Sequence, residues 1–443
     1  MEGRVAPRQL LYQDQLPLAI SSRSHRRIFH PEGANEYGAS GGTRTNIIRI
    51  PISADSMLDA QHSYLQFTLH NTGGNPMALD ITPASIIRRI RLESAGATLE
   101  EIVGYNKLYN SILFPAQADF SKGSENSMMQ GTEGRGNGAP QQLDDFTNTA
   151  LVPVAGTQGM TSAYQSPFIS SAAANTQDVG AVINGASSVV VSLPIVCGLL
   201  NMEKYVPLVM MSGGLVLEIE LDNAHSVGYS STRAAVGTSI VPEWKVSEVR
   251  YVAHLIDLER EFYDRMRAVM EGTGGVLQLA SQTYRNFQSS ITGGTAAEVS
   301  IPNRVKSVKS IFWCASNQAM DSGEVGAGNG GYASSSALNV LAGTGGQFQF
   351  RIGSVLYPPT AVRCSTSQKS EALMELNKAF GSIGFVDGKG SLLTAQSYAV
   401  NTNRAGAKYP VGNKAVYDSA FSFCPFGLDF EAFPRTALES GVN

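Results

Sequence analysis

The stretch Gly214–Asn223, GLVLEIELDN, decides the fold class that we expect for this chain. Aliphatic residues stand at every second position, and residues that are mostly acidic fill the positions between them: Leu215, Leu217, Ile219 and Leu221 against Val216, Glu218, Glu220 and Asp222. Successive side chains of a β-strand point to opposite faces of its sheet, so this alternation predicts a strand with one face on a core and the other facing away.

The same alternation recurs on both sides of this stretch. In one stretch the side chains expected on one strand face are Leu65, Phe67 and Leu69, and those on the other are Tyr64, Gln66, Thr68 and His70. In IRRIRLES, Ile90 and Leu92 are expected on one face and Arg89 and Arg91 on the other. Strand patterns begin again at WKVSEVRYVAHLIDL and continue to GQFQFRIGSVLYPP, whereas helical spacing is confined to short pieces such as LEREFYDRM. Many short strands separated by polar turns predict an all-β chain of two successive sandwiches. Residues 116–185 lack periodicity, and we expect them to be long excursions from this scaffold.

Composition restricts the function. Of 443 residues only 16% are charged, the formal net charge is -4, and the sequence pI is about 5.9. A chain whose whole surface binds nucleic acid is normally basic, so the acidic pI excludes this class of protein. A local basic patch that binds nucleic acid is still compatible with it. A surface that is polar but uncharged fits either loop-rich β structure or burial against neighbouring subunits, because interface cores are depleted in Lys, Glu and Asp.

The basic patch of the sequence lies at the N-terminus. Residues 1–45 carry Arg4, Arg8, Arg23, Arg26 and Arg27 with few acids and show no periodicity, which predicts either a frayed terminus or an arm that orders against a neighbour or touches phosphate with SRSHRR. No secretory h-region and no run of 18 apolar residues occurs. The chain is therefore expected in the cytosol or nucleus.

No stretch of the sequence predicts an active site, and we expect a protein that is not an enzyme and uses no catalytic residue, cofactor or metal. Glu218 and Glu220 share a strand face roughly 6.5 to 7 Å apart, a carboxylate spacing found in inverting glycosidases, but such residues flank the bond from opposite sides of a cleft. GAGNGG at Gly326–Gly331 lacks the strand directly before it and the helix directly after it that a dinucleotide-binding loop requires. DGKGS at Asp387–Ser391 departs from the phosphate-loop pattern, because no glycine stands five residues before Gly388 and Lys389 is followed by Gly. Cys197, Cys314, Cys364 and Cys424 are isolated and predict buried thiols.

Several stretches together resemble the double jelly-roll major capsid proteins of the adenovirus and tectivirus lineage, most closely those of polinton-like viruses and virophages. The matching pieces, in this order, are IIRRIRLESAGATLEEIVGYNKLYNSIL, LPIVCGLLNMEKYVPLVMMSGGLVLEIELDN, WKVSEVRYVAHLIDL, FRIGSVLYPPTAV, SEALMELNKAFG and GLDFEAFPRTALESGVN. The resemblance implies two eight-stranded jelly rolls with long loops and a few short helices: a basic arm at 1–45, the first roll at 46–235 and the second at 236–443. In similar proteins further strands follow the SGVN segment, so the second roll is expected to be incomplete, closed differently or completed by another part of the protein.

The resemblance also implies a local structure around the prolines of RIGSVLYPPTAV. A strand over Phe348–Tyr357 would end in a rigid corner at Pro358 and Pro359 and lead to a helix over Ser370–Phe380 with Leu373, Leu376 and Phe380 on its apolar stripe. Elementary chemistry agrees, because proline cannot donate to a strand ladder.

The function implied is that of a major capsid protein of a DNA virus. Homotrimers of nearly hexagonal outline would tile an icosahedral shell in the virion, after assembly in the cytoplasm or nucleus of the host. The partners implied are the chain itself, neighbouring capsomers, penton and minor capsid proteins, and an inner membrane or the genome through Arg23, Arg26 and Arg27. Two alternatives remain: a glycan-binding β-sandwich such as a spike or lectin, for which Trp244 and Trp313 would have to be exposed, and a capsid protein with one jelly roll and a projecting domain.

Overall fold

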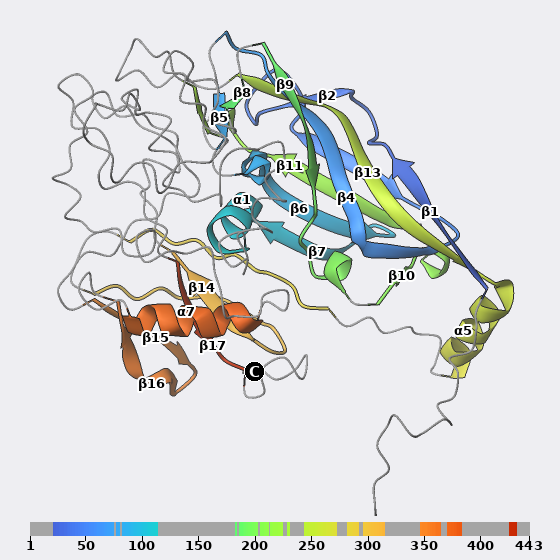
Figure 1. The fold of residues 1–443 in the computed structure, drawn as a ribbon. Coiled ribbons are helices and arrows are strands. Elements are labelled where there is room, and N and C mark those ends of the chain that lie inside the picture. Colours follow the sequence, from blue (N-terminus) through green and yellow to red (C-terminus); the bar gives the residue numbers. More distant parts are fainter. Residues whose placement is uncertain are drawn as a thin grey trace, which may run out of the picture.

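The computed structural model consists mainly of β-sheet with a few short helices (Figure 1). It describes residues 21–74, 77–79, 82–113, 182–183, 186–202, 204–211, 213–224, 228–230, 243–272, 281–291, 296–314, 346–364, 370–382 and 425–431. Most of the excursions expected at 116–185 and both glycine-rich loops, at 326–331 and 387–391, lie outside the described residues; within 116–185 only residues 182–183 are described, and they form a short strand.

One sheet of the first sandwich has six antiparallel strands. These are β1 (Ser22–Phe29), β2 (Glu36–Gly38), β4 (Met57–Asn71), β9 (Ser188–Leu193), β10 (Val206–Pro207) and β13 (Trp244–Leu258). The two long strands β4 and β13 pair at its centre; β1 and β2 pair with the free side of β13, and β9 and β10 pair with the free side of β4. The sheet therefore combines strands from residues 22–71 with strands from residues 188–258.

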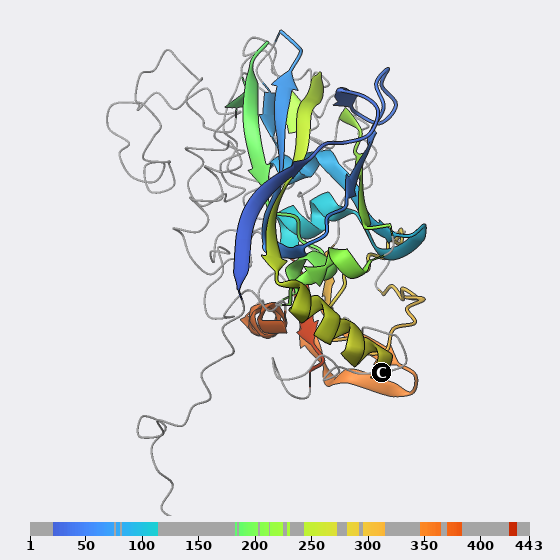
Figure 2. The same cartoon turned by 90° about the vertical axis from the view of Figure 1, so that its right-hand side faces the viewer.

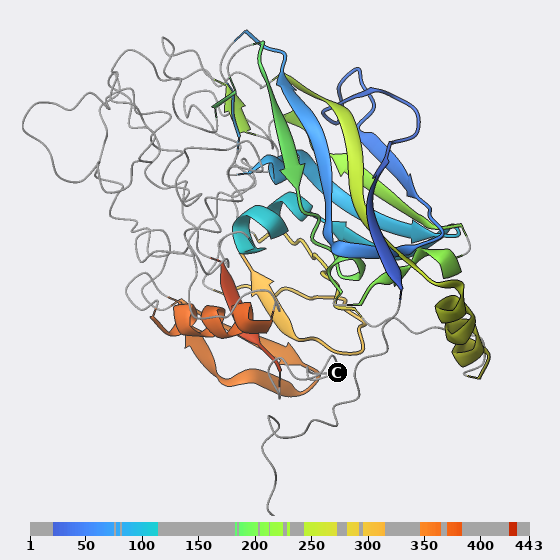
Figure 3. The ribbon, with the colours of Figure 1, turned by 45° about the vertical axis from the view of Figure 1, so that its right-hand side comes forward.

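The second sheet of the sandwich has four antiparallel strands in the order β3-β11-β6-β7. Their bounds are β3 (Ile47–Ile52), β11 (Leu215–Leu221), β6 (Ile87–Ser94) and β7 (Ala97–Val103). The two sheets face each other, as Figures 2 and 3 show from two further directions, and one hydrophobic core fills the space between them.

The alternation of GLVLEIELDN builds this core as predicted. Leu215, Leu217, Ile219 and Leu221 are at most 1% exposed, and they meet the equally buried Leu65, Leu69, Ile90 and Leu92. Burying one such side chain contributes about 1.5 to 3 kcal/mol relative to leaving it in water. The strand predictions for these stretches are confirmed.

Three strands of the six-stranded sheet, β1, β2 and β13, lie outside the range 46–235 that we expected for the first jelly roll. Trp244–Leu258, expected at the start of the second roll, is β13 and pairs with β4 from Trp244 opposite Asn71 to Ile256 opposite Met57. Ser22–Phe29, expected within the arm, is β1 and pairs residue by residue with β13, although only Phe29 reaches the core. The two differences have different causes. β13 alternates as predicted and its buried face belongs to the core of the first sandwich, but alternation does not show with which strand it pairs. β1 pairs beyond the edge of the core, where alternation does not report a strand.

A second, smaller body contains strands and one helix from the C-terminal half (Figure 1). Its elements are β14 (Ser310–Trp313), β15 (Gln347–Ile352), β16 (Val355–Arg363), α7 (Ser370–Ser382) and β17 (Phe426–Asp429). Helix α7 confirms the helix expected there, and Leu376 and Phe380 of its stripe are buried while Leu373 packs at the edge of the same cluster. The rings of Trp313 and Phe426 stack at 4.4 Å between centroids.

The expected corner at Pro358 and Pro359 requires a correction, because both prolines lie inside β16. The ladder with β15 is broken there: Phe350 pairs with Tyr357, and the next pair is Phe348 with Val362. In the gap the Gln349 side chain donates from Nε2 to the carbonyl oxygens of Pro358 at 2.6 Å and Pro359 at 3.1 Å. The Gln349 amide thus satisfies the carbonyl oxygens of the two prolines where the ladder between β15 and β16 is interrupted.

The remaining elements are short. They are β5 (Met77–Leu79), β8 (Val182–Ile183) and β12 (Gly228–Ser230), which form a small sheet, the helical turns η2 (Pro83–Ile86), α1 (Tyr105–Lys107), η3 (Leu108–Leu113), η5 (Leu199–Asn201) and η6 (Leu208–Met210), and helix α5 (Arg260–Gly272). Helix α5 follows β13 directly and projects from the end of the sandwich (Figures 1 and 3). None of the helices among the described residues is long and apolar enough to cross a membrane.

Candidate assembly surfaces

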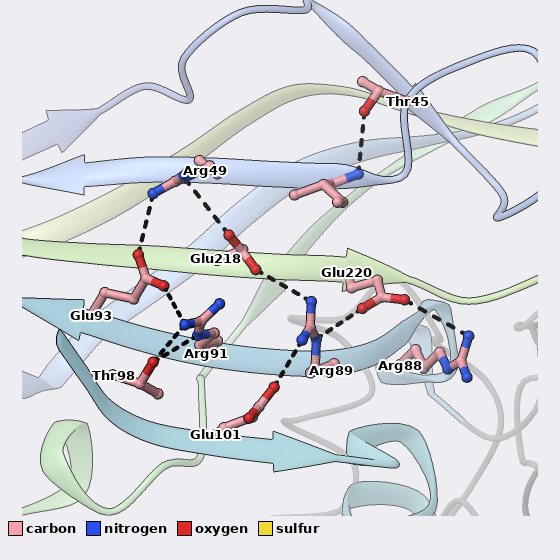
Figure 4. Close-up of polar contacts among 11 residues, drawn as sticks. Thr45, Arg49, Arg88, Arg89, Arg91, Glu93, Thr98, Glu101, Glu218 and Glu220 are labelled. Carbon is pink, nitrogen blue, oxygen red and sulfur yellow. Dashed lines mark hydrogen bonds and ion pairs between the residues drawn. The ribbon is translucent and has the colours of Figure 1, made fainter. Parts of the chain in front are cut away.

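The outer face of the four-stranded sheet carries a ladder of alternating charges (Figure 4). Direct strand partners place Arg49 of β3 opposite Glu218 of β11, and Glu218 opposite Arg91 of β6. The ladder, which we call the charged face, has four arginines and four glutamates: Arg49, Arg88, Arg89, Arg91, Glu93, Glu101, Glu218 and Glu220.

Arg89 is the centre of this network. Its guanidinium lies 2.8 Å from Glu101 Oε1, 3.3 Å from Glu218 Oε1 and 2.8 Å from Glu220 Oε2. Burial lowers the pKa of Arg89, but the three carboxylates together outweigh this effect, so the pKa is raised above its usual value. Arg89 is therefore held charged between three acids.

Every carboxylate of the charged face has an arginine within 4 Å. Glu218 also approaches Arg49 at 3.7 Å, and Glu220 approaches Arg88 at 3.7 Å. Glu93 bridges Arg49 at 3.2 Å and Arg91 at 2.9 Å. The face has no net charge, so another surface can cover it without supplying counter-charges.

This geometry gives Glu218 and Glu220 a different role from that of the glycosidase pair weighed above. They do share one strand face, as expected, but both point outward on a sheet surface and are paired with arginines (Figure 4). A general acid and a base would have to approach a bond from opposite sides. The described residues also contain no group of three or more His, Cys, Asp or Glu side chains that could hold a metal ion.

The three arginines expected to touch an anionic partner, Arg23, Arg26 and Arg27, lie on β1 at the edge of the six-stranded sheet. Their neighbour His25 contacts Asp257 at 3.1 Å, and the Arg27 guanidinium lies 5.0 Å from the centre of the Phe29 ring. Within the described part of the chain, the three arginines form no ion pair. β1 thus presents fixed positive charge on an ordered strand.

Neither the tryptophans nor the three cysteines among the described residues are exposed. Trp244 is 4% exposed, and Trp313 lies in the aromatic cluster of the second body, so neither offers the platform that a glycan-binding sandwich would need. Cys197 and Cys364 are buried, and burial raises the pKa of both thiols. Cys314 is half-buried, and Cys424 lies outside the described residues.

Sequence reasoning missed two features. The pairing partners of Glu218 and Glu220 come from strands more than a hundred residues away, and no local pattern reports such pairs. Glu100 is the second: it occupies a core-facing position of β7, two residues before Ile102, and is 8% exposed. The signal that could have identified Glu100 is its position in the alternation: it stands where the pattern of the strand places a buried aliphatic residue.

Comparison with known proteins relates this architecture to viral capsids. No protein-family model matches the sequence, and no curated protein shows significant similarity to it. Among solved structures, a chain of the PBCV-1 virus capsid aligns with 97% of this chain and 83% of its own length, at 12% identity and a TM-score of 0.52.

Two further solved structures align with this chain at lower TM-scores. The mavirus major capsid protein aligns with 96% of this chain and 82% of its own, at 11% identity and a TM-score of 0.37. A PBCV-1 protein fitted into a reconstruction of the virophage Sputnik aligns with 58% of this chain and 47% of its own, at 11% identity and a TM-score of 0.35. The likeness to the PBCV-1 capsid chain extends along nearly the whole length of this chain. It shows that this chain has an all-β, double jelly-roll fold.

Proposed function

We propose that this chain is a major capsid protein whose homotrimers tile an icosahedral viral shell. The observation that carries the proposal is the likeness to the PBCV-1 virus capsid over 97% of this chain, which includes both halves and not one sandwich alone. A chain with two similar sandwiches, repeated three times around an axis, has a nearly six-fold outline. Such an outline packs into flat facets.

The surfaces fit a protein that is covered by copies of itself. The charged face is neutral because its ion pairs are made within the chain. Repeated packing then brings no net repulsion between neighbours, and each interface can combine an apolar centre with a polar rim. Penton and minor capsid proteins would fill the positions that the trimers leave open, and the chain would reside in the virion after assembly in the host cytoplasm or nucleus.

We further propose that β1 faces the interior of the shell and that Arg23, Arg26 and Arg27 meet an inner membrane or the genome there. Because Ser22–Phe29 is part of a sheet, deleting it would damage the sandwich. Substituting the three arginines by glutamine is the cleaner test. Loss of packaging with normal shells would support this role, and unchanged packaging would contradict it.

Packing also suggests a revised division of the chain. We propose that the first jelly roll extends from Ser22 to Leu258, the first residue of β1 and the last of β13, because both strands belong to its sheet. The second roll would then begin after α5.

The capsid proposal is tested by the mass of the purified chain in solution, measured by light scattering, with negative-stain images of the same sample. A stable trimer with a hexagonal outline, or closed shells, is the expected result. A monodisperse monomer at high concentration would contradict the proposal.

A further inference from the structure

Residues 282–286, at the start of the C-terminal half, lie against the first sandwich. The extended segment that contains them passes between the sandwich and the second body, drawn in yellow in Figures 1 and 3. Tyr284 packs against both hydrophobic cores, as do Leu108 and Val196 of the first half. Among the described residues, this segment is therefore one of the places where the two halves of the chain share apolar contacts.

Glu100 fixes this segment by hydrogen bonds. Its Oε1 accepts from the backbone N–H of Gly198 at 2.8 Å and from Thr283 Oγ1 at 2.7 Å, and its Oε2 accepts from the backbone N–H of Leu199 at 3.2 Å. A buried carboxylate is tolerated only when hydrogen bonds replace the water that it has lost, and bonds to a charged acceptor are the strong ones. One side chain thus ties β7, the turn at Gly198 and Thr283 together.

Two glycines make room for the segment. A methyl group on Gly198 would overlap the carbonyl oxygen of Gln282, and one on Gly104 would overlap the side-chain amide of Asn286. Gly198 has ordinary right-handed helical angles, so space and not backbone conformation explains the glycine there. Gly104 also has a φ of 68°, which disfavours other residues.

We propose that Glu100, Gly104 and Gly198 form a docking groove on the first jelly roll that fixes residues 282–286 and thereby sets the orientation of the second half on the first. Glu100 is the positioning residue of this groove. Its importance for assembly rests on the proposed capsid function, because three chains close into a flat hexagonal tile only when both sandwiches hold one mutual angle.

Hydrogen exchange of the purified full chain tests the groove directly. In Gly198→Ala and in Glu100→Gln, the amides of residues 198 and 199, which donate to Glu100 in the parent protein, should exchange at least about tenfold faster, because the contact is displaced in the first variant and an acceptor oxygen is lost in the second. Glu101→Gln is the matched control: Glu101 is the next residue along β7, points to the opposite face and pairs with Arg89. Exchange in Gly198→Ala and Glu100→Gln that equals the parent rate would overturn the proposal.

Thr283 separates a positioning role from general loss of folding. Thr283→Ser keeps the hydroxyl that donates to Glu100 and should leave exchange within about twofold of the parent, whereas Thr283→Val removes the donor and should accelerate it. Equal exchange in the two variants would contradict the role assigned to this hydrogen bond.

The orientation itself is measurable between spin labels at Val190→Cys and Met374→Cys, which are 54% and 60% exposed on the first sandwich and on α7. One narrow distance distribution is expected in the parent background and a broadened or shifted one with Glu100→Gln, with single-label samples as controls for native thiols. An unchanged distribution would overturn the groove proposal, whatever the oligomeric state. A parent protein that stays monomeric while the variant still broadens the distribution would contradict the capsid function alone.

Discussion

Lys309 Nζ lies 2.8 Å from Glu431 Oε1, and the two side chains are only 14% and 1% exposed. The pair stands at the end of the β14–β17 ladder, where the N–H of Phe430 also donates to the carbonyl oxygen of Lys309 at 2.8 Å. An ion pair that is largely shielded from solvent therefore lies at the end of the two-stranded sheet β14–β17. Removing one partner would deprive the other, buried charge of this ion pair.

We expect Lys309→Met to destabilise the second body selectively. Breaking a buried ion pair typically costs about 3 to 5 kcal/mol, so amide exchange in β14 and β17 should accelerate by roughly a hundredfold or more. Lys378→Met is the control, because Lys378 pairs with Glu375 on the exposed side of α7 and such pairs contribute at most about 1 kcal/mol. Equal exchange in the two variants would show that the Lys309 pair has no special weight.

Asp429 leads to a prediction on pH. Burial raises the pKa of this carboxyl, and the nearby Glu431 and Glu375 raise it further, despite the hydrogen bond from the N–H of Glu431. The folded chain therefore binds a proton at Asp429 more tightly than the unfolded chain, and stability is lost as the pH rises from the ordinary value of 3.8 through the folded pKa.

Asp429→Asn should consequently raise the melting temperature at pH 7, and the gain should shrink toward pH 4. Asparagine keeps the oxygen that accepts from Glu431 N, so no bond is lost. Asp264→Asn on the exposed face of α5 serves as the control and should show no such trend. A gain that is the same at both pH values would rule out the proposed titration.

The charged face should depend mainly on Arg89. Arg89→Met leaves Glu101, Glu218 and Glu220 without their shared partner, and we expect a loss of about 1 to 3 kcal/mol in the free energy of unfolding of the first sandwich. Salt screens the repulsion among the three carboxylates that the arginine no longer separates, so the loss should be smaller at 1 M than at 0.1 M NaCl.

Arg88→Met provides the comparison. Arg88 is half-exposed and has one contact of 3.7 Å, to Glu220, so its removal should cost less than about 0.5 kcal/mol in urea unfolding followed through the first sandwich. Losses of the same size in both variants would contradict a network centred on Arg89.

The sequence predicted those elements whose side chains report their burial. β11 alternates along its whole length and β6 alternates from Arg89 to Leu92, because these stretches cross the core, and α7 shows its stripe because Leu376 and Phe380 face a cluster. β1 gave no such signal: its pairing with β13 spans more than two hundred residues, and its side chains extend beyond the core. Long-range backbone pairing without burial cannot be recognised in a local pattern.

The candidate surfaces were predictable to a similar extent. Alternation placed Glu218 and Glu220 on the outward face of their strand, but which arginines they meet depends on strand order and register. Glu100 shows the converse, because its sequence position indicates that it is buried but not that Thr283, in the other half of the chain, donates to it. Residue spacing thus predicts faces, and only topology determines contacts.

Gln349 explains how one strand accommodates the two prolines of RIGSVLYPPTAV, and this explanation can be tested. Its amide donates to the carbonyl oxygens of Pro358 and Pro359, which have lost their ladder partners in the gap between the Phe350–Tyr357 and Phe348–Val362 pairs. Gln349→Ala should therefore cost about 1 to 2 kcal/mol and speed exchange across β15 and β16, since each such bond contributes about 0.5 to 1.5 kcal/mol. Gln347→Ala, at the exposed start of β15, should leave exchange unchanged. If the two variants behaved alike, the prolines would be held by the aromatic contact of Tyr357 with Phe430, at 5.5 Å between ring centroids, and not by the glutamine.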